Sequence, residues 1–469
     1  MITGPWGAFA RRFRGREKMS QTLSVVARTE QCLANITQYD PQVNAFITVM
    51  EEGALAGAGQ ADAGVERGDP CGLLHGLPIS VKDCIDVAEV RCTNGTRFFE
   101  KYVPVEDALV VQRLRRAGAI IVGKTNLHEF AYGSTTQNPH YGPTRNPWDL
   151  QRIPSGSSGG AAVSVALEMC AGAVASDTGG SIRTPAAVNG VSGLRPTVGA
   201  IPMSGSMTQL CPAIDTVGPI ASTVEIIARM FTVMAGYDDR DPTSVAHVWD
   251  EFLQRLDDGI EGVRIGLPKN YFFEDLAPGI GEAVRASAEK LAAAGAVLVD
   301  LELAGAEVTL KEIMPMVWAD CYEFHQERVE QQPEMFGEDV LGRILLGRDV
   351  SGRDYAAALR CRERWSRVVQ RALREVDVIL TPTTPLPAPL IPDSRDMLST
   401  THQLTRFTYP LSWAGLPGLS VPCGFTADGL PIGMLLNGAC WEEGILLRLG
   451  SAFQRDTNWH LRRPPMLHG

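Results

Sequence analysis

The sequence lacks the features that mark several classes of protein. Its ten cysteines form no Cys-x-x-Cys pair and no cluster with histidine at metal-ligand spacing. No apolar run reaches the roughly 18 residues of a membrane span. Acidic residues outnumber basic ones by 54 to 43, so the net charge is −11. We therefore expect a cytoplasmic protein with reduced thiols, no membrane contact and no direct binding of nucleic acid.

The length of the chain predicts one large globular unit or two. It has 469 residues, which exceeds the size at which a single core usually stops growing. Residues 1–18 place their basic side chains after the apolar ones and contain no hydrophobic signal-peptide core. This segment is expected to be a flexible N-terminal extension, with a weak amphipathic anchor as the alternative. We expect residues 19–469 to form one domain.

Short apolar segments alternate with helical periodicity along most of the chain. Strands are predicted at 77–81, 120–125, 263–268 and 376–382, and two more flank the Asp428-Gly429 turn. Helical spacing at 20–65 predicts two helices, separated by the break at Asp40-Pro41. This alternation indicates an α/β fold with a central twisted mixed β-sheet surrounded by helices. Residues from about 240 to 400 are expected to be a variable, cap-like part.

A phosphate-loop pattern occurs at Gly118–Thr125, which fits GxxxxGK[ST]. In a phosphate loop the four middle residues form a turn whose N–H groups face the phosphates. Here those residues are Ala-Ile-Ile-Val, which are typical of a strand. We interpret the match as accidental.

Two groups of serines lie on glycine-rich backbone between residues 155 and 183. Ser157 and Ser158 stand among glycines, and Ser181 directly follows Gly179-Gly180. A serine nucleophile requires a base and N–H donors for the oxyanion. Successive N–H groups leading into Ser181 can converge on one point, because glycine adopts backbone angles that side chains forbid. The pattern predicts a nucleophile and its oxyanion donors in one loop.

Two other interpretations of the first serine group are less consistent with its surroundings. The segment GSSGG contains the nucleophile-elbow pattern GxSxG, with Ser158 at its centre. An elbow needs an apolar strand before it, whereas RNPWDLQRIPSG is polar and broken by prolines. A flexible linker is the second alternative, but GSSGG leads into a long apolar run of small residues.

Lys82 follows the predicted strand at 77–81 and is the candidate base. Burial penalises the charge of a lysine, so Lys82 needs a partner such as Asp83 or is neutral. A neutral buried lysine can accept a proton near neutral pH. One serine of GSSGG could then relay a proton between Lys82 and Ser181. The residues therefore suggest a serine amide hydrolase with a lysine base.

These motifs resemble the amidase signature enzymes, which are serine hydrolases with a Ser-cisSer-Lys triad. The resemblance covers nearly the whole chain, from VNAFITV to GLPIGMLLNG, and is most specific over the signature core, residues 75–220. It implies that Ser181 is the nucleophile, that Lys82 is the base, and that Ser157 relays protons and follows a cis peptide bond. It implies no metal or organic cofactor.

The resemblance also assigns supporting roles. The oxyanion would be bound by the backbone N–H groups of Thr178, Gly179, Gly180 and Ser181. Structural support would come from Asp177, Arg183 and Ser158. The substrate pocket would be lined by Tyr132, Gly133 and Ser134. One departure from the pattern is Ser155, where many members have glycine.

We expect a stand-alone amidohydrolase that cleaves the C–N bond of a small amide, carbamate or biuret-type substrate. Its only expected partner is the small-molecule amide, with a homodimer left open. The alternative is the glutaminase component of a glutamine-dependent tRNA amidotransferase complex, which also resembles YGPTRNPWD and SDTGGSIR. In that pattern glutamine commonly follows the arginine of SDTGGSIR, whereas this chain has Thr184. A catalytically silent interaction protein is disfavoured because all three triad residues are present.

Overall fold

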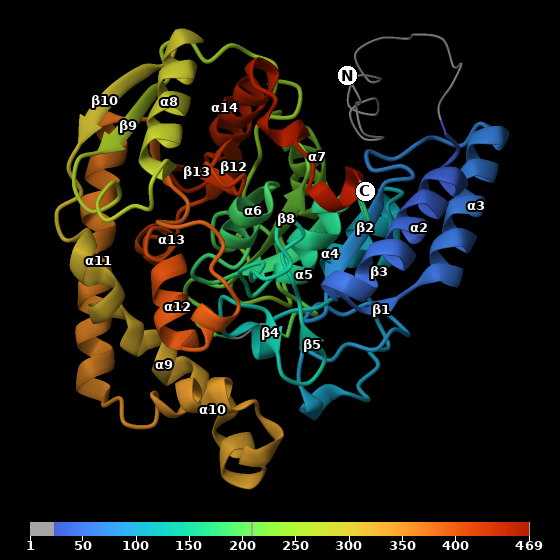
Figure 1. Ribbon diagram of the computed structural model, residues 1–469, viewed down its shortest axis with the longest axis horizontal. Coiled ribbons are helices and arrows are strands. Elements are labelled where there is room, and N and C mark those ends of the chain that lie inside the picture. The colour runs from blue at the N-terminus through green and yellow to red at the C-terminus, as the bar shows by residue number, and fades with distance from the viewer. Residues whose placement is uncertain (1–22, 208–209, 469) are drawn as a thin grey trace.

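A single mixed β-sheet organises the chain, with helices packed around it (Figure 1). The computed structural model describes residues 23–207 and 210–468, so the extension expected at 1–18 lies outside the described residues. Among the described residues, eleven strands form the sheet, in the order β1 (Phe46–Val49), β3 (Ile120–Thr125), β2 (Pro78–Lys82), β6 (Gly172–Asp177), β8 (Thr216–Ala221), β7 (Ser192–Arg195), β12 (Gly418–Phe425), β13 (Pro431–Gly438), β11 (Val378–Pro382), β9 (Arg264–Pro268) and β10 (Val297–Leu301). A separate short ribbon pairs β4 (Gln137–Asn138) with β5 (Gly142–Pro143).

The helices follow the alternation that the sequence predicts. They are α2 (Val25–Val43), α3 (Glu51–Arg67), α4 (Leu109–Arg116), α5 (Gly159–Ala166), α6 (Arg183–Asn189), α7 (Val224–Met234), α8 (Ile280–Ala293), α9 (Ala306–Gln331), α10 (Glu338–Leu345), α11 (Gly352–Glu375), α12 (Met397–Leu404), α13 (Thr408–Trp413) and α14 (Glu443–Asp456). Within the described part of the chain, no helix is both long enough and apolar enough to cross a membrane. The predicted α/β fold with a central mixed sheet is confirmed.

The sheet is mixed, with parallel pairs among β3, β2 and β6 and among β11, β9 and β10, and antiparallel pairs elsewhere. Strand β2 pairs in parallel with β3 and β6, whereas β6 pairs antiparallel with β8. The segment expected to be cap-like contributes β9, β10 and β11 to the same sheet, and its limits stay a prediction. Strands β2, β3, β6 and β8 are buried along their whole length, so polar side chains at their ends need partners inside the protein.

The expectation of two helices across 20–65 is wrong in two respects. Helix α2 continues through Pro41 to Val43, because polar groups stabilise its end. Asn44 adopts a left-handed conformation and donates its N–H to the carbonyl of Asp40, whose carboxylate accepts from the amide of Ala45. The segment that then follows is strand β1, whose residue Phe46 pairs with Thr125 of β3. Tertiary pairing with β3 therefore outweighs the helical spacing of its apolar residues.

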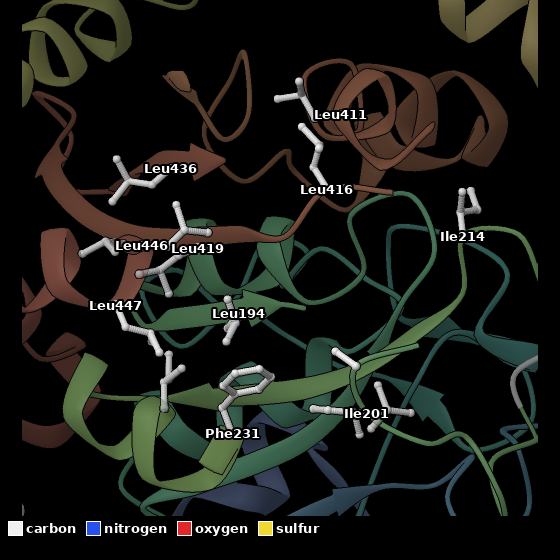
Figure 2. Close-up of a cluster of buried hydrophobic side chains, with 14 of the residues drawn as sticks. Leu194, Ile201, Ile214, Phe231, Leu411, Leu416, Leu419, Leu436, Leu446 and Leu447 are labelled. Atoms are coloured by element: carbon white, nitrogen blue, oxygen red, sulfur yellow. The ribbon is translucent and has the colours of Figure 1, made fainter. Parts of the chain in front are cut away.

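A row of leucines joins the C-terminal half of the sheet to the helices. Leu419 of β12 lies opposite Leu194 of β7 on one side and opposite Leu436 of β13 on the other. Leu446 and Leu447 of α14 belong to the same buried cluster, as Figure 2 shows. Burying each such leucine contributes about 2 kcal/mol. This packing fixes β12 and β13 against the strands that carry the functional loops.

Glu443, at the start of α14, gives a test of the buried polar contacts around this core. Its side chain is buried, its Oε1 accepts from the amide of Thr197 at 2.7 Å, and burial raises its pKa to about 7. The pKa of Glu443 is higher in the folded state than in the unfolded state. The free energy of unfolding of the wild type therefore falls as the pH rises from 4.5 to about 7. Replacing Glu443 by Gln keeps the acceptor and removes this loss. We expect the variant to gain about 3 kcal/mol over the wild type between pH 4 and 8, measured by chemical unfolding. Parallel stability curves for the two proteins would contradict it.

Candidate active site

Lys82 ends strand β2 inside the protein, and its side chain is fully buried. Its Nζ donates hydrogen bonds to Ser157 Oγ at 2.7 Å and to Ser176 Oγ at 2.9 Å. Burial lowers the pKa of Lys82 to about 8, and the negative charges of Asp177 and Asp215 limit the shift. The neutral amine is therefore accessible at mildly alkaline pH, and it lies within hydrogen-bond reach of a serine hydroxyl.

Asp83, the candidate partner of Lys82, instead pairs with another lysine. Lys124 Nζ lies 2.8 Å from Asp83 Oδ1, and both side chains are fully buried. The second oxygen of Asp83 accepts from the amide and the hydroxyl of Thr93. Strand β3 brings Lys124 here, and this strand contains most of the segment that matches the phosphate-loop pattern, which agrees with an accidental match. Among the described residues no carboxylate pairs directly with Lys82, so burial determines its protonation.

The loop with Ser157 and Ser158 begins helix α5 without a strand before it. Within 144–158 the chain is irregular apart from isolated bridges, so the nucleophile-elbow alternative lacks its required strand. The peptide bond between Gly156 and Ser157 is cis, as the family resemblance implies. Ser158 Oγ donates to the carbonyl oxygen of Ser176 at 3.2 Å. Ser176 thus contacts both this loop and Lys82, and no sequence pattern singled it out beyond its place before Asp177.

An ion pair closes the loop from Thr178 to Ile182. Asp177 ends β6 and Arg183 begins α6, and the guanidinium lies 2.9 and 3.0 Å from the two carboxylate oxygens. Burial opposes ionisation of Asp177, but the charge and hydrogen bonds of Arg183, together with the charge of Arg195 and the amide of Ile182, outweigh it and lower the pKa of the carboxyl. A Cβ at Gly179 would lie 2.1 Å from the ring of Tyr409, so only glycine fits there. The pair therefore holds a tight glycine turn at the end of the strand.

Thr184 connects the two serine loops. Its Oγ1 donates to the carbonyl oxygens of Gly180, at 3.0 Å, and Gly156, at 3.4 Å, and accepts from Ser155 Oγ at 3.0 Å. Ser155 and Thr184 are the two positions at which the sequence departs from the patterns described above. Because they are hydrogen-bonded to each other, the two departures belong to one local arrangement that sets the spacing of the loops.

A pocket next to these loops is lined by half of the expected site residues. Ser181, Thr178 and Gly179 line it together with Tyr132, Gly133 and Ser134. The remaining lining residues are Ala131, Leu210, Met314, Trp318, Arg343, Leu398, Thr401, His402, Thr405 and Tyr409. Asp177, Arg183 and Ser158, the residues expected to give structural support, are buried and do not line the pocket. The sequence therefore identified one side of the pocket, and helices α9, α10, α12 and α13 supply the other.

Arg343 of α10 is the functional candidate that sequence reasoning missed. Only 4% of it is exposed, and it donates to Asp339 Oδ2 on the same helix. His128 Nε2 lies 3.0 Å from both the Arg343 guanidinium and Asp339, which fixes α10 against the loop after β3. An arginine on an amphipathic helix normally indicates a solvated face, so a single sequence carried no signal for a buried cation in the pocket.

The amidase family model matches residues 27–447, a range that contains every site residue named above. The chain belongs to the amidase signature family, whose members are enzymes that hydrolyse C–N bonds. Two curated relatives are each the A component of a glutamyl-tRNA(Gln) amidotransferase. The protein of Carboxydothermus hydrogenoformans is 37% identical, over 95% of this chain and 97% of its own. That of Chloroflexus aggregans is 39% identical, over 95% of each chain.

Solved structures agree with this family. One is described as an unexpected vestigial protein complex that reveals the origins of an s-triazine catabolic enzyme; it has a TM-score of 0.87 and 33% identity, over 92% of this chain and 95% of its own. Another is the corresponding component of the glutamyl-tRNA(Gln) amidotransferase of Thermotoga maritima, with a TM-score of 0.79 and 31% identity, over 94% and 97% of the two chains.

The relatives overturn the expected partners. The sequence suggested a stand-alone enzyme with a small amide as its only partner, no nucleic acid and a homodimer left open. Both curated relatives are instead named as one subunit of a larger enzyme, and that enzyme is named for a tRNA. The prediction of no nucleic-acid partner rested on net charge and composition. These describe a single chain and carry no information about the subunits with which it assembles.

Proposed function

We propose that this chain is the amide-hydrolysing subunit of an amidotransferase assembly, in which it cleaves the side-chain carboxamide of glutamine. Support comes from the curated relatives, which match it over nearly its full length. The released ammonia would pass to a partner subunit that acts on a tRNA-linked substrate. The single structural observation that carries the chemistry is the buried contact between Lys82 Nζ and Ser157 Oγ.

In the proposed mechanism Ser181 attacks the carboxamide carbon. Ser157 accepts the proton of Ser181 while its own proton moves to neutral Lys82. The backbone N–H groups from Thr178 to Ser181 bind the negative oxygen of the tetrahedral intermediate. The proton returns through Ser157 to the nitrogen of the substrate, and ammonia leaves. Water then attacks the acyl-enzyme by the same relay in reverse, which frees the acid and restores Ser181.

Arg343 accounts for recognition of the substrate in this proposal. Its guanidinium is almost fully buried in the pocket, and its Nε has no hydrogen-bond partner among the described residues. A buried cation of this kind favours a ligand with a carboxylate, which accepts charge-assisted hydrogen bonds. Glutamine carries such a carboxylate at the end opposite its carboxamide.

Replacing Arg343 by Gln tests this role. We expect KM for L-glutamine to rise about 10- to 100-fold, because a hydrogen bond to a charged group is worth about 1.5–3 kcal/mol. An uncharged amide of similar size should be affected much less. Steady-state ammonia release measures both, with Arg328→Gln on α9 as the control, since Arg328 lies outside the pocket lining. Equal losses for the charged and uncharged amides would show that Arg343 does not bind the carboxylate.

A second candidate substrate is a urea or carbamate that has a carboxylate but no ammonium group. It is favoured by the pocket itself, because none of the described residues that line it is an aspartate or a glutamate. The ammonium group of glutamine would therefore lack an ionic partner there. In this case too the chain would act as one component of a complex.

One experiment separates the two candidates. The full chain is prepared with and without the partner subunits of a glutamyl-tRNA(Gln) amidotransferase, and each preparation is supplied with L-glutamine and with a carboxylated biuret. Products are identified by mass spectrometry, with the Ser181→Ala variant as a blank. Glutamine hydrolysis that rises with the partner subunits present and feeds amidation of a glutamyl-tRNA supports the first candidate. Turnover of the biuret without glutamine hydrolysis would replace it by the second.

A further inference from the structure

Asp215 connects the glycine turn at Ser181 to a second loop of the pocket. Its Oδ1 accepts from the hydroxyl of Thr178 at 2.6 Å. Its Oδ2 accepts from the amides of Leu210, at 2.9 Å, and Cys211, at 3.0 Å. Thr178 and Leu210 both line the catalytic pocket, and Asp215 is only 3% exposed. One buried carboxylate therefore binds two segments that meet at the reaction site.

The backbone before Thr178 is held separately. Asp177 is the last residue of β6 and pairs with Thr216, the first residue of β8. Thr216 Oγ1 donates to the carbonyl oxygen of Asp177 at 2.9 Å, and Arg195 also contacts that oxygen. Thr178 is the first residue beyond this pairing, and its side chain is anchored by Asp215, which immediately precedes β8. Strand pairing therefore fixes the backbone up to Asp177, and the hydrogen bond to Asp215 fixes the next residue, Thr178.

We propose that Asp215 is a positioning residue of the hydrolytic site, which aims the N–H groups of the turn from Thr178 to Ser181 by holding the Thr178 hydroxyl and the Leu210 amide together. The inference rests on the oxyanion role proposed above for that turn. A donor stabilises the transition state only if it points to where the oxyanion forms. Loss of the contact should therefore lower kcat more than it changes KM.

The electrostatic surroundings of Asp215 give an independent readout. Burial raises its pKa to about 6, and Arg195 of β7 opposes the shift. The other titratable groups that interact with it are Lys82 of β2, Cys211, Cys321 of α9 and Tyr409 of α13. Below pH 6 the carboxyl gains a proton and no longer accepts as an anion. A second fall in kcat should then add to the fall caused by protonation of Lys82.

The test compares four single variants and one double variant, assayed as the full chain with its partner subunits on L-glutamine and on a carboxylated biuret. Asp215→Asn and Thr178→Val should each lower kcat about 10- to 100-fold with KM changed less than about threefold. Thr178→Ser, which restores the hydroxyl, should recover at least about tenfold over Thr178→Val. The double variant Asp215→Asn with Thr178→Val should have a kcat no more than about threefold below that of the less active single variant, because both changes remove the same contact.

Asp241→Asn is the matched control. Asp241 is also buried and also accepts from loop amides, those of Met203 and Thr243, but it does not line the catalytic pocket. It should keep wild-type kcat. In the pH profile, the slope of log kcat should steepen below pH 6 in the wild type and stay near one in Asp215→Asn.

Equal effects of Asp215→Asn and Asp241→Asn on kcat, or fully additive losses in the double variant, would overturn the inference. These outcomes differ from failure of the proposed chemistry. If Ser181→Ala keeps its turnover, the serine mechanism itself is wrong. If Ser181→Ala is inactive and Asp215→Asn behaves like Asp241→Asn, only the positioning role of Asp215 is lost.

Discussion

Replacing Ser181 by Ala is expected to abolish amide hydrolysis, with a loss in kcat of about 10⁴-fold or more. The reason is that no acyl-enzyme can form without the hydroxyl, whereas the Lys82–Ser157 contact stays in place. The side chain lines the pocket and is not part of the hydrophobic core, so the unfolding temperature should stay close to that of the wild type. Ammonia release and thermal unfolding measure the two effects.

Ser158→Ala is the matched control for this variant. Ser158 belongs to the neighbouring loop, and its hydroxyl donates to the carbonyl oxygen of Ser176. The control should keep labelling by a fluorophosphonate probe, whereas Ser181→Ala should lose it. A Ser181→Ala protein that retains substantial turnover, or that is still labelled, would remove Ser181 from the nucleophile role.

Replacing Lys82 by Met should lower kcat about 10³-fold or more, because positioned proton transfer contributes up to about 10⁴-fold in enzymes. Methionine fills a similar volume but cannot accept the proton from Ser157. Among the described residues Lys82 has no carboxylate partner, so little stability should be lost. Steady-state kinetics and chemical unfolding test both statements.

Lys124→Met provides the contrast. Lys124 is equally buried, but its removal leaves the carboxylate of Asp83 without its ionic partner. We expect a loss of about 3–5 kcal/mol in the free energy of unfolding. If Lys82→Met destabilises the protein as strongly as Lys124→Met does, Lys82 is a structural cation and not a base.

The pH dependence of the wild type follows from the same residue. Only the neutral amine of Lys82 accepts a proton, and burial sets its pKa to about 8. The active fraction is then about 10% at pH 7 and about 1% at pH 6. We expect kcat to rise about tenfold between pH 6 and 7 and about fivefold between pH 7 and 8, and to level off above pH 9. A flat profile between pH 6 and 9 would exclude Lys82 as the base.

Local sequence patterns were sufficient for the parts of the protein that lie close together along the chain. The apolar runs predicted β2, β3 and β11, and the Asp428-Gly429 turn predicted the hairpin of β12 and β13. The glycine-rich segments placed Ser157 and Ser181 in two loops, and Thr184 joins those loops in the structure. Where local pattern and tertiary pairing disagreed, as at β1, the pairing prevailed.

Local sequence patterns could not predict the contacts between segments that lie far apart along the chain. The order and register of strands decide that Asp83 pairs with Lys124 and that Thr178 meets Asp215. Arg343 enters the pocket from a helix that follows Ser181 by about 160 residues along the chain. No periodicity or spacing encodes such a meeting, because it depends on how separate elements pack.

The sequence by itself determined the α/β class, the serine-rich glycine loops and a lysine at the end of a buried strand, since each follows from short-range periodicity and turn chemistry. Only the tertiary structure decided that no carboxylate among the described residues pairs with Lys82, that a cation lines the pocket, and that one carboxylate holds two of its loops. Burial and charge compensation are properties of the packed interior, so the chemistry of these residues emerges only when the strands and helices are assembled around them.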